Sequence, residues 1–239
     1  MDDLIDDFIY ACWGDDLKGV DSFLSIPGFD PNASGDNQWN GLQNACCSGA
    51  KLVVAKLLSL PNTDLGVRTT VGSTLLHLAC EAEDIDIVKL LLQHPLIDID
   101  ACDNYGETSL FNTAKAGHIG IMKVLILAGA DIGKKNKKGN NILTGRSNFG
   151  VMKLILDNAS PSLTYDLMTC VDDNQETTFS IDILKLSDAS VKYLLIKLTL
   201  AAKQLGLEVN IGNARHSLFE EYRANPEIIW LWQEEKKMV

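Results

Sequence analysis

The chain has 239 residues, of which 46% are hydrophobic, 22% charged and 7% aromatic. An apolar fraction of this size excludes a chain that is mainly disordered. The formal charge of −11 argues against a general affinity for nucleic acid or anionic membranes, because the overall field repels polyanions.

The amino-terminal and the most hydrophobic segments predict neither a secretory signal nor a membrane span. The chain begins Met-Asp-Asp-Leu-Ile-Asp-Asp, without the basic start and long apolar core of a signal peptide. The most hydrophobic stretch, residues 193–207, is interrupted by Lys197 and Lys203. We therefore expect a cytoplasmic protein that does not bind membranes, with a nuclear location as the alternative.

Three of the six cysteines follow a fixed spacing. Cys12, Cys46 and Cys80 are each 34 residues apart, and each follows an alanine. Equal spacing of a small residue in one local context marks a repeated structural position, whereas bridged cysteines have no reason to keep a period. Cysteine packs well as a small apolar side chain, and reduced thiols suit the cytosol. We predict that these three thiols are buried and unbridged.

The 34-residue period extends to the starts and ends of predicted helices. The ends at 23–27, 57–61 and 91–95 superpose. Residues able to cap a helix recur at its start, each followed two positions later by a large apolar side chain: Asp6, Asn40, Thr74, Thr108, Asn141 and Thr177. Each unit is therefore predicted to be two short helices followed by a polar connector. Stacking such pairs would bury a continuous core.

These units resemble the ankyrin repeat, whose signature is Thr-Pro-Leu-His-x-Ala followed by a Gly-His turn. The third unit has Thr74-Leu75-Leu76-His77-Leu78-Ala79 and the fourth has Gly117-His118, although another residue replaces the signature proline in every unit. The resemblance implies an all-α ankyrin-repeat solenoid of about six repeats with finger loops between them. The approximate boundaries are 1–33, 34–67, 68–101, 102–134, 135–168 and 169–200, followed by a helical capping segment at 201–239.

The last two repeats depart from the pattern. In the fifth, about three residues are missing before Val151, and Arg146 stands where a small residue is expected, so we expect a short first helix. In the sixth, residues 172–179 follow the pattern of 103–110. A second helix over 191–197 would complete that repeat.

No recognisable catalytic or metal-binding constellation is present in the sequence. The resemblance implies structural positions for His77 and His118, and no Cys-x-x-Cys or His-x-x-x-His pair accompanies them. Paired acids such as Asp172-Asp173 are typical of a solvated surface at this net charge. We predict a protein without catalytic residues, metal or cofactor. The competing hypothesis is a cysteine-dependent enzyme using Cys47, the thiol expected to be exposed.

The resemblance also implies a protein partner, bound by the fingers and the exposed side of the first helices. Carried over one position at a time, the partner-binding residues are Asp36, Asn37, Trp39, Cys47, Arg68, Thr70, Val71, Glu81, Asn104, Tyr105, Glu107, Lys115, Lys135, Lys137 and Lys138. Trp39 and Tyr105 are the candidate anchors, since a good aromatic anchor contributes ~2 kcal/mol or more to an interface. Alternatively, Trp39 packs onto a neighbouring finger.

Charge is segregated along the predicted array. The early repeats are acidic, whereas the fifth finger carries four lysines between residues 134 and 138. This pattern favours a partner with a complementary charge gradient, which would mainly set the association rate and orientation. The alternative is a lysine-rich tip that only keeps the protein soluble.

The carboxyl-terminal segment allows two interpretations. Asn225-Pro226 is a good helix start, and the apolar residues 228–232 follow it. Such a helix could cover the open face of the last repeat or dock into a groove of a partner. We predict a monomeric adaptor, scaffold or inhibitor that binds another protein through its repeats. The alternative is an enzyme regulator whose aromatic terminal helix carries the binding.

Overall fold

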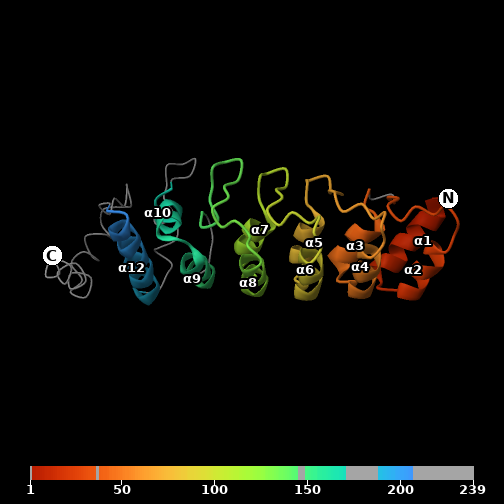
Figure 1. Cartoon of the computed structure of the whole chain (residues 1–239), viewed down its shortest axis with the longest axis horizontal. Helices are drawn as coiled ribbons and strands as arrows, with labels where there is room; N and C mark the ends of the chain where they lie inside the picture. The colour runs from red at the N-terminus through yellow and green to blue at the C-terminus, as the bar shows by residue number, and fades with distance from the viewer. Residues whose placement is uncertain (1, 36–37, 145–148, 171–187, 207–239) are drawn as a thin grey trace. The chain divides into compact units, whose positions relative to one another are not determined.

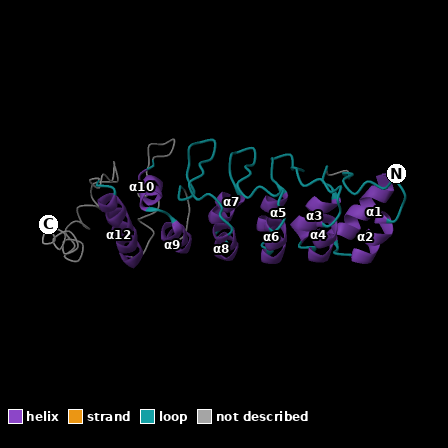
Figure 2. Cartoon of the chain, in the orientation of Figure 1, coloured by secondary structure: helices purple, strands orange, loops and turns teal. Residues whose placement is uncertain are grey.

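The computed structural model describes residues 2–35, 38–144, 149–170 and 188–206 (Figure 1). In these ranges the chain forms helices joined by loops (Figure 2), and the β-pairing consists of two isolated bridges, Ser34 with Asn40 and Cys102 with Thr108. The chain divides into two compact units, Met1–Lys137 and Lys138–Val239. The predictions about the sixth finger and the segment after residue 206 lie outside the described residues.

The first unit consists of successive helix pairs. The pairs are α1 (Asp2–Trp13) with α2 (Leu17–Leu24), α3 (Gly41–Ser48) with α4 (Lys51–Leu58), α5 (Leu75–Glu81) with α6 (Ile85–Leu92), and α7 (Ser109–Ala116) with α8 (Ile119–Leu127). First helices pack against first helices and second helices against second helices along the chain. The prediction of an all-α ankyrin-repeat fold is confirmed. Among the described residues, no helix has both the length and the apolar character needed to cross a membrane.

Side-chain caps begin the first helices of the second, third and fourth repeats. Asn40, Thr74 and Thr108 each accept a hydrogen bond from the backbone N–H three residues later. Such a cap contributes ~1 kcal/mol. The predicted cap at Asp6 is wrong, because this residue lies inside α1. Residues 2–5 continue the helix by a further turn, where an acid such as Asp3 interacts favourably with the positive end of the helix dipole.

The three periodic cysteines lie in the core of the first unit. Cys12 and Cys46 are 0% exposed and Cys80 is 2% exposed, and all three are free thiols. Burial raises the pKa of Cys12 and of Cys80 to about 12, and it also raises the pKa of Cys46. The prediction of buried, unbridged thiols is confirmed.

The turn between the two helices of each repeat has the same left-handed backbone. Its φ is positive at Asp15 (55°), Gly49 (80°), Glu83 (58°) and Gly117 (83°). Only glycine adopts this conformation without strain. The non-glycine residues also make contacts there: Asp15 Oδ1 accepts from the N–H of Val53 at 3.0 Å, and Glu83 pairs with His118 at 3.0 Å.

The second unit contains α9 (Phe149–Asn158), α10 (Pro161–Thr169) and α12 (Asp188–Gln204), and α10 packs against α12. In place of a described first helix, residues 141–144 form a turn in which Asn141 Oδ1 accepts from the N–H of Thr144. Helix α10 was not predicted, since the sequence analysis placed these residues at the end of the fifth repeat without naming a helix there. Its start is nevertheless typical, because Ser160 caps it and proline stands in the first turn.

A carboxylate on α9 ties this helix to α12. Asp157 contacts Lys153 at 2.6 Å and Lys197 at 2.7 Å, and it accepts a 2.6 Å hydrogen bond from the hydroxyl of Tyr193. Burial opposes the charge on Asp157, but these three donors outweigh burial and hold its pKa below the usual range. Burial, followed by the neighbouring carboxylate, raises the pKa of Tyr193.

Candidate protein-binding surface

The finger loops of the third, fourth and fifth repeats are joined by backbone hydrogen bonds. The N–H of Asn104 donates to the carbonyl of Val71 at 3.0 Å, and the N–H of Lys137 donates to the carbonyl of Tyr105 at 2.9 Å. These bonds connect equivalent points of successive fingers. The fingers are thereby held in a fixed spacing, which limits the conformational entropy that they could lose on binding.

Two predicted partner-binding residues add side-chain bonds between these fingers. Arg68 Nη1 donates to the carbonyl of Cys102 at 2.7 Å and to that of Gly72 at 2.9 Å. Asn104 Nδ2 donates to the carbonyl of Thr70 at 3.1 Å. Arg68 and Asn104 are exposed but also hold the surface together, which the sequence analysis did not foresee.

Glycine allows the close approach of the fingers. Gly72 and Gly106 have φ of 83° and 78°. A Cβ on Gly72 would lie 2.7 Å from the backbone nitrogen of Asn104, and one on Gly106 would lie 2.9 Å from that of Lys137. Gln38 takes the same position in the second finger with φ of 64° and therefore carries backbone strain there.

Most of the predicted contact residues lie at the surface. Tyr105 is 60% and Val71 is 46% exposed, whereas Trp39 is half-buried. The other exposed positions are Cys47, Arg68, Thr70, Glu81, Asn104, Lys115, Lys135, Lys137 and Lys138. The structure brings Val71 and Tyr105 together on adjacent, hydrogen-bonded fingers. Asp36 and Asn37 lie outside the described residues.

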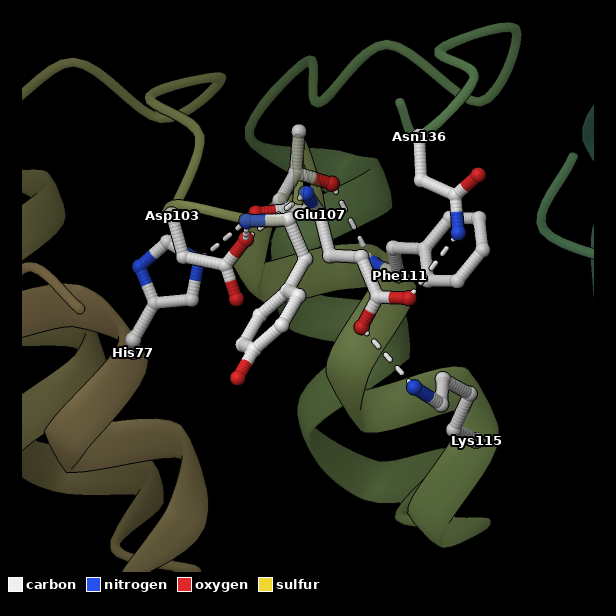
Figure 3. Close-up of polar contacts among 8 residues, drawn as sticks. His77, Asp103, Glu107, Phe111, Lys115 and Asn136 are labelled. Atoms are coloured by element: carbon white, nitrogen blue, oxygen red, sulfur yellow. Dashed lines mark hydrogen bonds and ion pairs between the residues drawn. The ribbon is translucent and has the colours of Figure 1, made fainter. Parts of the chain in front are cut away.

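Glu107 is an exception, and its prediction as an exposed contact residue is wrong. Only 8% of the residue is exposed. Its carboxylate accepts from Lys115 Nζ at 2.8 Å and from Asn136 Nδ2 at 3.0 Å (Figure 3). A desolvated carboxylate needs such partners, because an unpaired buried charge is strongly unfavourable. Glu107 therefore links α7 to the fifth finger.

His77 has a structural role. Its Nε2 lies 3.1 Å from the carbonyl of Glu107, and its Nδ1 lies 3.2 Å from the N–H of Thr74. A carbonyl can only accept, so Nε2 carries the proton and Nδ1 accepts. Burial lowers the pKa of His77 and keeps the ring neutral.

Within the described part of the chain, no group of three or more His, Cys, Asp or Glu residues could hold a metal ion.

The exposed thiol is not activated as a nucleophile. Cys47 is exposed as predicted, but burial of its sulfur and then the nearby Glu81 raise its pKa. A reactive cysteine requires the opposite shift, because the thiolate is the nucleophile. This environment disfavours the hypothesis of a cysteine-dependent enzyme.

Two exposed aromatic residues of α1 were missed in the sequence. Tyr10 is 73% and Trp13 is 56% exposed, and their ring centroids are 6.3 Å apart. The repeat contains the signal that could have found Trp13, since this residue stands 34 positions before Cys47. Trp13 therefore occupies in α1 the surface position that Cys47 occupies in α3.

Stacked helix pairs with hydrogen-bonded fingers define a repeat protein with an extended surface. A sequence family described as "Ankyrin repeats (3 copies)" matches residues 42–136, and we assign this segment to the ankyrin-repeat family. This assignment agrees with the resemblance found in the sequence and with the helical fold.

Three curated proteins illustrate the similarity. The chain is 41% identical over 54 residues to ankyrin repeat domain-containing protein 29 of Homo sapiens, which covers 23% of this chain and 18% of that protein. It is 35% identical over 85 residues to SMC5-SMC6 complex localization factor protein 1 of Homo sapiens, and this match covers 35% of this chain and 8% of that protein. It is 30% identical over 113 residues to a putative ankyrin repeat protein of Rickettsia bellii, and this match covers 46% of this chain and 62% of that protein. The matches thus span less than two thirds of each relative.

Proposed function

We propose that this chain is a non-catalytic protein-interaction module, acting as an adaptor, scaffold or inhibitor. The partner would bind the fingers and the exposed side of the first helices. The observation that carries this proposal is the pair Val71 and Tyr105, exposed on fingers that backbone hydrogen bonds hold in place. An exposed aromatic side chain on a rigid support is a typical interface anchor.

Other observations favour a protein over other ligands. The net charge of −11 repels nucleic acid. The raised pKa of Cys47 argues against thiol catalysis. One relative is named as a localization factor for a protein complex, a role that agrees with binding of another protein. We further propose that the chain is monomeric and cytoplasmic, with a nuclear location as the alternative.

Quantitative affinity capture from a cell lysate tests this function. The wild-type chain is compared with a double variant, Val71→Ala with Tyr105→Ala, and with a matched control, Leu127→Ala. Leu127 is 86% exposed at the end of α8, so its loss also removes exposed apolar surface without altering a finger. We expect the double variant to reduce the captured partner about tenfold and the control to retain it. Equal capture by all three would refute a finger-centred function.

A further inference from the structure

The exposed side of the first helices carries one equivalent side chain per repeat. These residues, which we call the inner-helix column, are Trp13 on α1, Cys47 on α3, Glu81 on α5 and Lys115 on α7. All four are exposed. Because successive first helices pack against one another, the column advances by one helix spacing, roughly 8–10 Å, per repeat.

The column begins with an apolar end. The ring of Trp13 lies beside that of Tyr10, and both are largely exposed. The exposed thiol of Cys47 follows in the next repeat. A large aromatic surface of this kind gains most from contact with an apolar or aromatic side chain.

The middle of the column carries the acid Glu81, which makes no hydrogen bond and has no paired cation among the described residues. The guanidinium of Arg68 donates instead to the carbonyls of Gly72 and Cys102. Asp103 lies near the same helix, because its Oδ1 accepts from the N–H of Glu107 at 2.9 Å, and the carbonyl of Glu107 lies 3.1 Å from His77 Nε2, one turn before Glu81 on α5. Burial, followed by Asp103, raises the pKa of Glu81. Lys115 does not compensate this charge, because its ammonium group is 2.8 Å from Glu107.

The position of Asp103 is fixed by its own finger. Asp103 Oδ1 accepts from the N–H of Tyr105 at 2.8 Å and from the N–H of Glu107 at 2.9 Å. The exposed ring of Tyr105 therefore belongs to the same turn as the carboxylate. Carboxylates and an aromatic ring together favour a cationic side chain, by ion pairing and by cation–π contact.

From this complementarity we propose that the inner-helix column binds an extended segment of the partner, with an apolar side chain at Trp13 and Cys47 and a lysine or arginine between Glu81 and Asp103. The proposal rests on the function proposed above and specifies the chemistry of the partner. An extended chain rises ~3.3 Å per residue, so one repeat corresponds to roughly three residues. The basic residue is expected roughly three residues from the side chain at Cys47 and roughly six from the one at Trp13.

The test uses synthetic nine-residue fluorescein-labelled peptides and fluorescence polarisation with the full chain. Each peptide has a fixed leucine or tryptophan, with Lys, Arg, Gln or Glu placed three or six residues away. We expect the Lys and Arg peptides to bind about tenfold more tightly than the Glu peptides. Glu81→Lys should reverse this order, and Trp13→Ala should weaken all peptides. The matched control is Asp166→Lys on α10, which makes the same charge change at an exposed position outside the column and should leave the preference unaltered.

Three results would overturn the proposal: no peptide binding by the wild-type chain, equal affinity for basic and acidic peptides, or a preference that survives Glu81→Lys. Circular dichroism of each variant identifies loss of fold, and Glu81→Gln provides a milder substitution if the reversal destabilises α5. The two proposals fail separately. If lysate capture depends on Val71 and Tyr105 while the peptides show no charge preference, only the column proposal is wrong.

Discussion

Replacing Gly72 by alanine should separate two neighbouring fingers. Gly72 has φ of 83°, where an alanine costs ~1–2 kcal/mol. The added Cβ would also lie 2.7 Å from the backbone nitrogen of Asn104, which donates to the carbonyl of Val71. Loss of that hydrogen bond adds ~1 kcal/mol. We therefore expect Gly72→Ala to lower the free energy of unfolding by ~2–3 kcal/mol.

Gly139→Ala is the matched control, because it separates backbone strain from collision. Gly139 has φ of 76°, but the described structure places no atom within 4 Å of its added Cβ. Its replacement should cost only the conformational ~1–2 kcal/mol. Urea unfolding gives both free energies, and hydrogen exchange should show faster exchange of the Asn104 amide in Gly72→Ala. Equal costs for the two variants, with unchanged exchange at Asn104, would refute the close contact of the fingers.

Three further predictions concern the first unit. Gln38→Gly should raise the free energy of unfolding by ~1 kcal/mol in urea titrations, since it relieves a positive φ of 64°; a loss of stability would contradict the assigned turn. Iodoacetamide at pH 8 should modify Cys47 more slowly than it modifies a free cysteine, because the pKa of Cys47 is raised. The buried thiols of Cys12, Cys46 and Cys80 should stay unmodified until the protein unfolds. Early labelling of these three, detected by mass spectrometry, would contradict their burial. The folded pKa of His77 is depressed from its ordinary 6.5, so its contribution to stability is present above pH 6.5 and is lost as the pH falls through the folded pKa. His77→Gln should flatten the dependence of the unfolding free energy on pH, measured by urea titrations. The same pH dependence in the variant and the wild type would refute this role of His77.

Local and periodic features were predictable from the sequence. The caps at Asn40, Thr74 and Thr108 depend on side chains that reach only three residues along their own helix. The buried cysteines share one position of the repeat, and a repeat exposes or buries the same position each time. The period also predicts an exposed position for Trp13, 34 residues before Cys47, although the sequence analysis overlooked its pair with Tyr10.

Features that depend on packing against a segment distant in the sequence were not predictable from the 34-residue period. Helix α10 carries its own start signals, but the two-helix repeat pattern provides no place for a further helix here, and its packing partner α12 begins after residue 187.

By itself, the sequence determined the helix-pair repeat, three of its caps and its thiol core, because these follow from spacing along one chain. Only the tertiary structure decided which of the predicted surface residues support the fingers and which stay exposed. Glu107 stands at a position expected to be exposed, yet Asn136, 29 residues later, and Lys115 both bond to its carboxylate. Burial of a charge depends on what the next repeat places against it, and the period of a single repeat contains no such information.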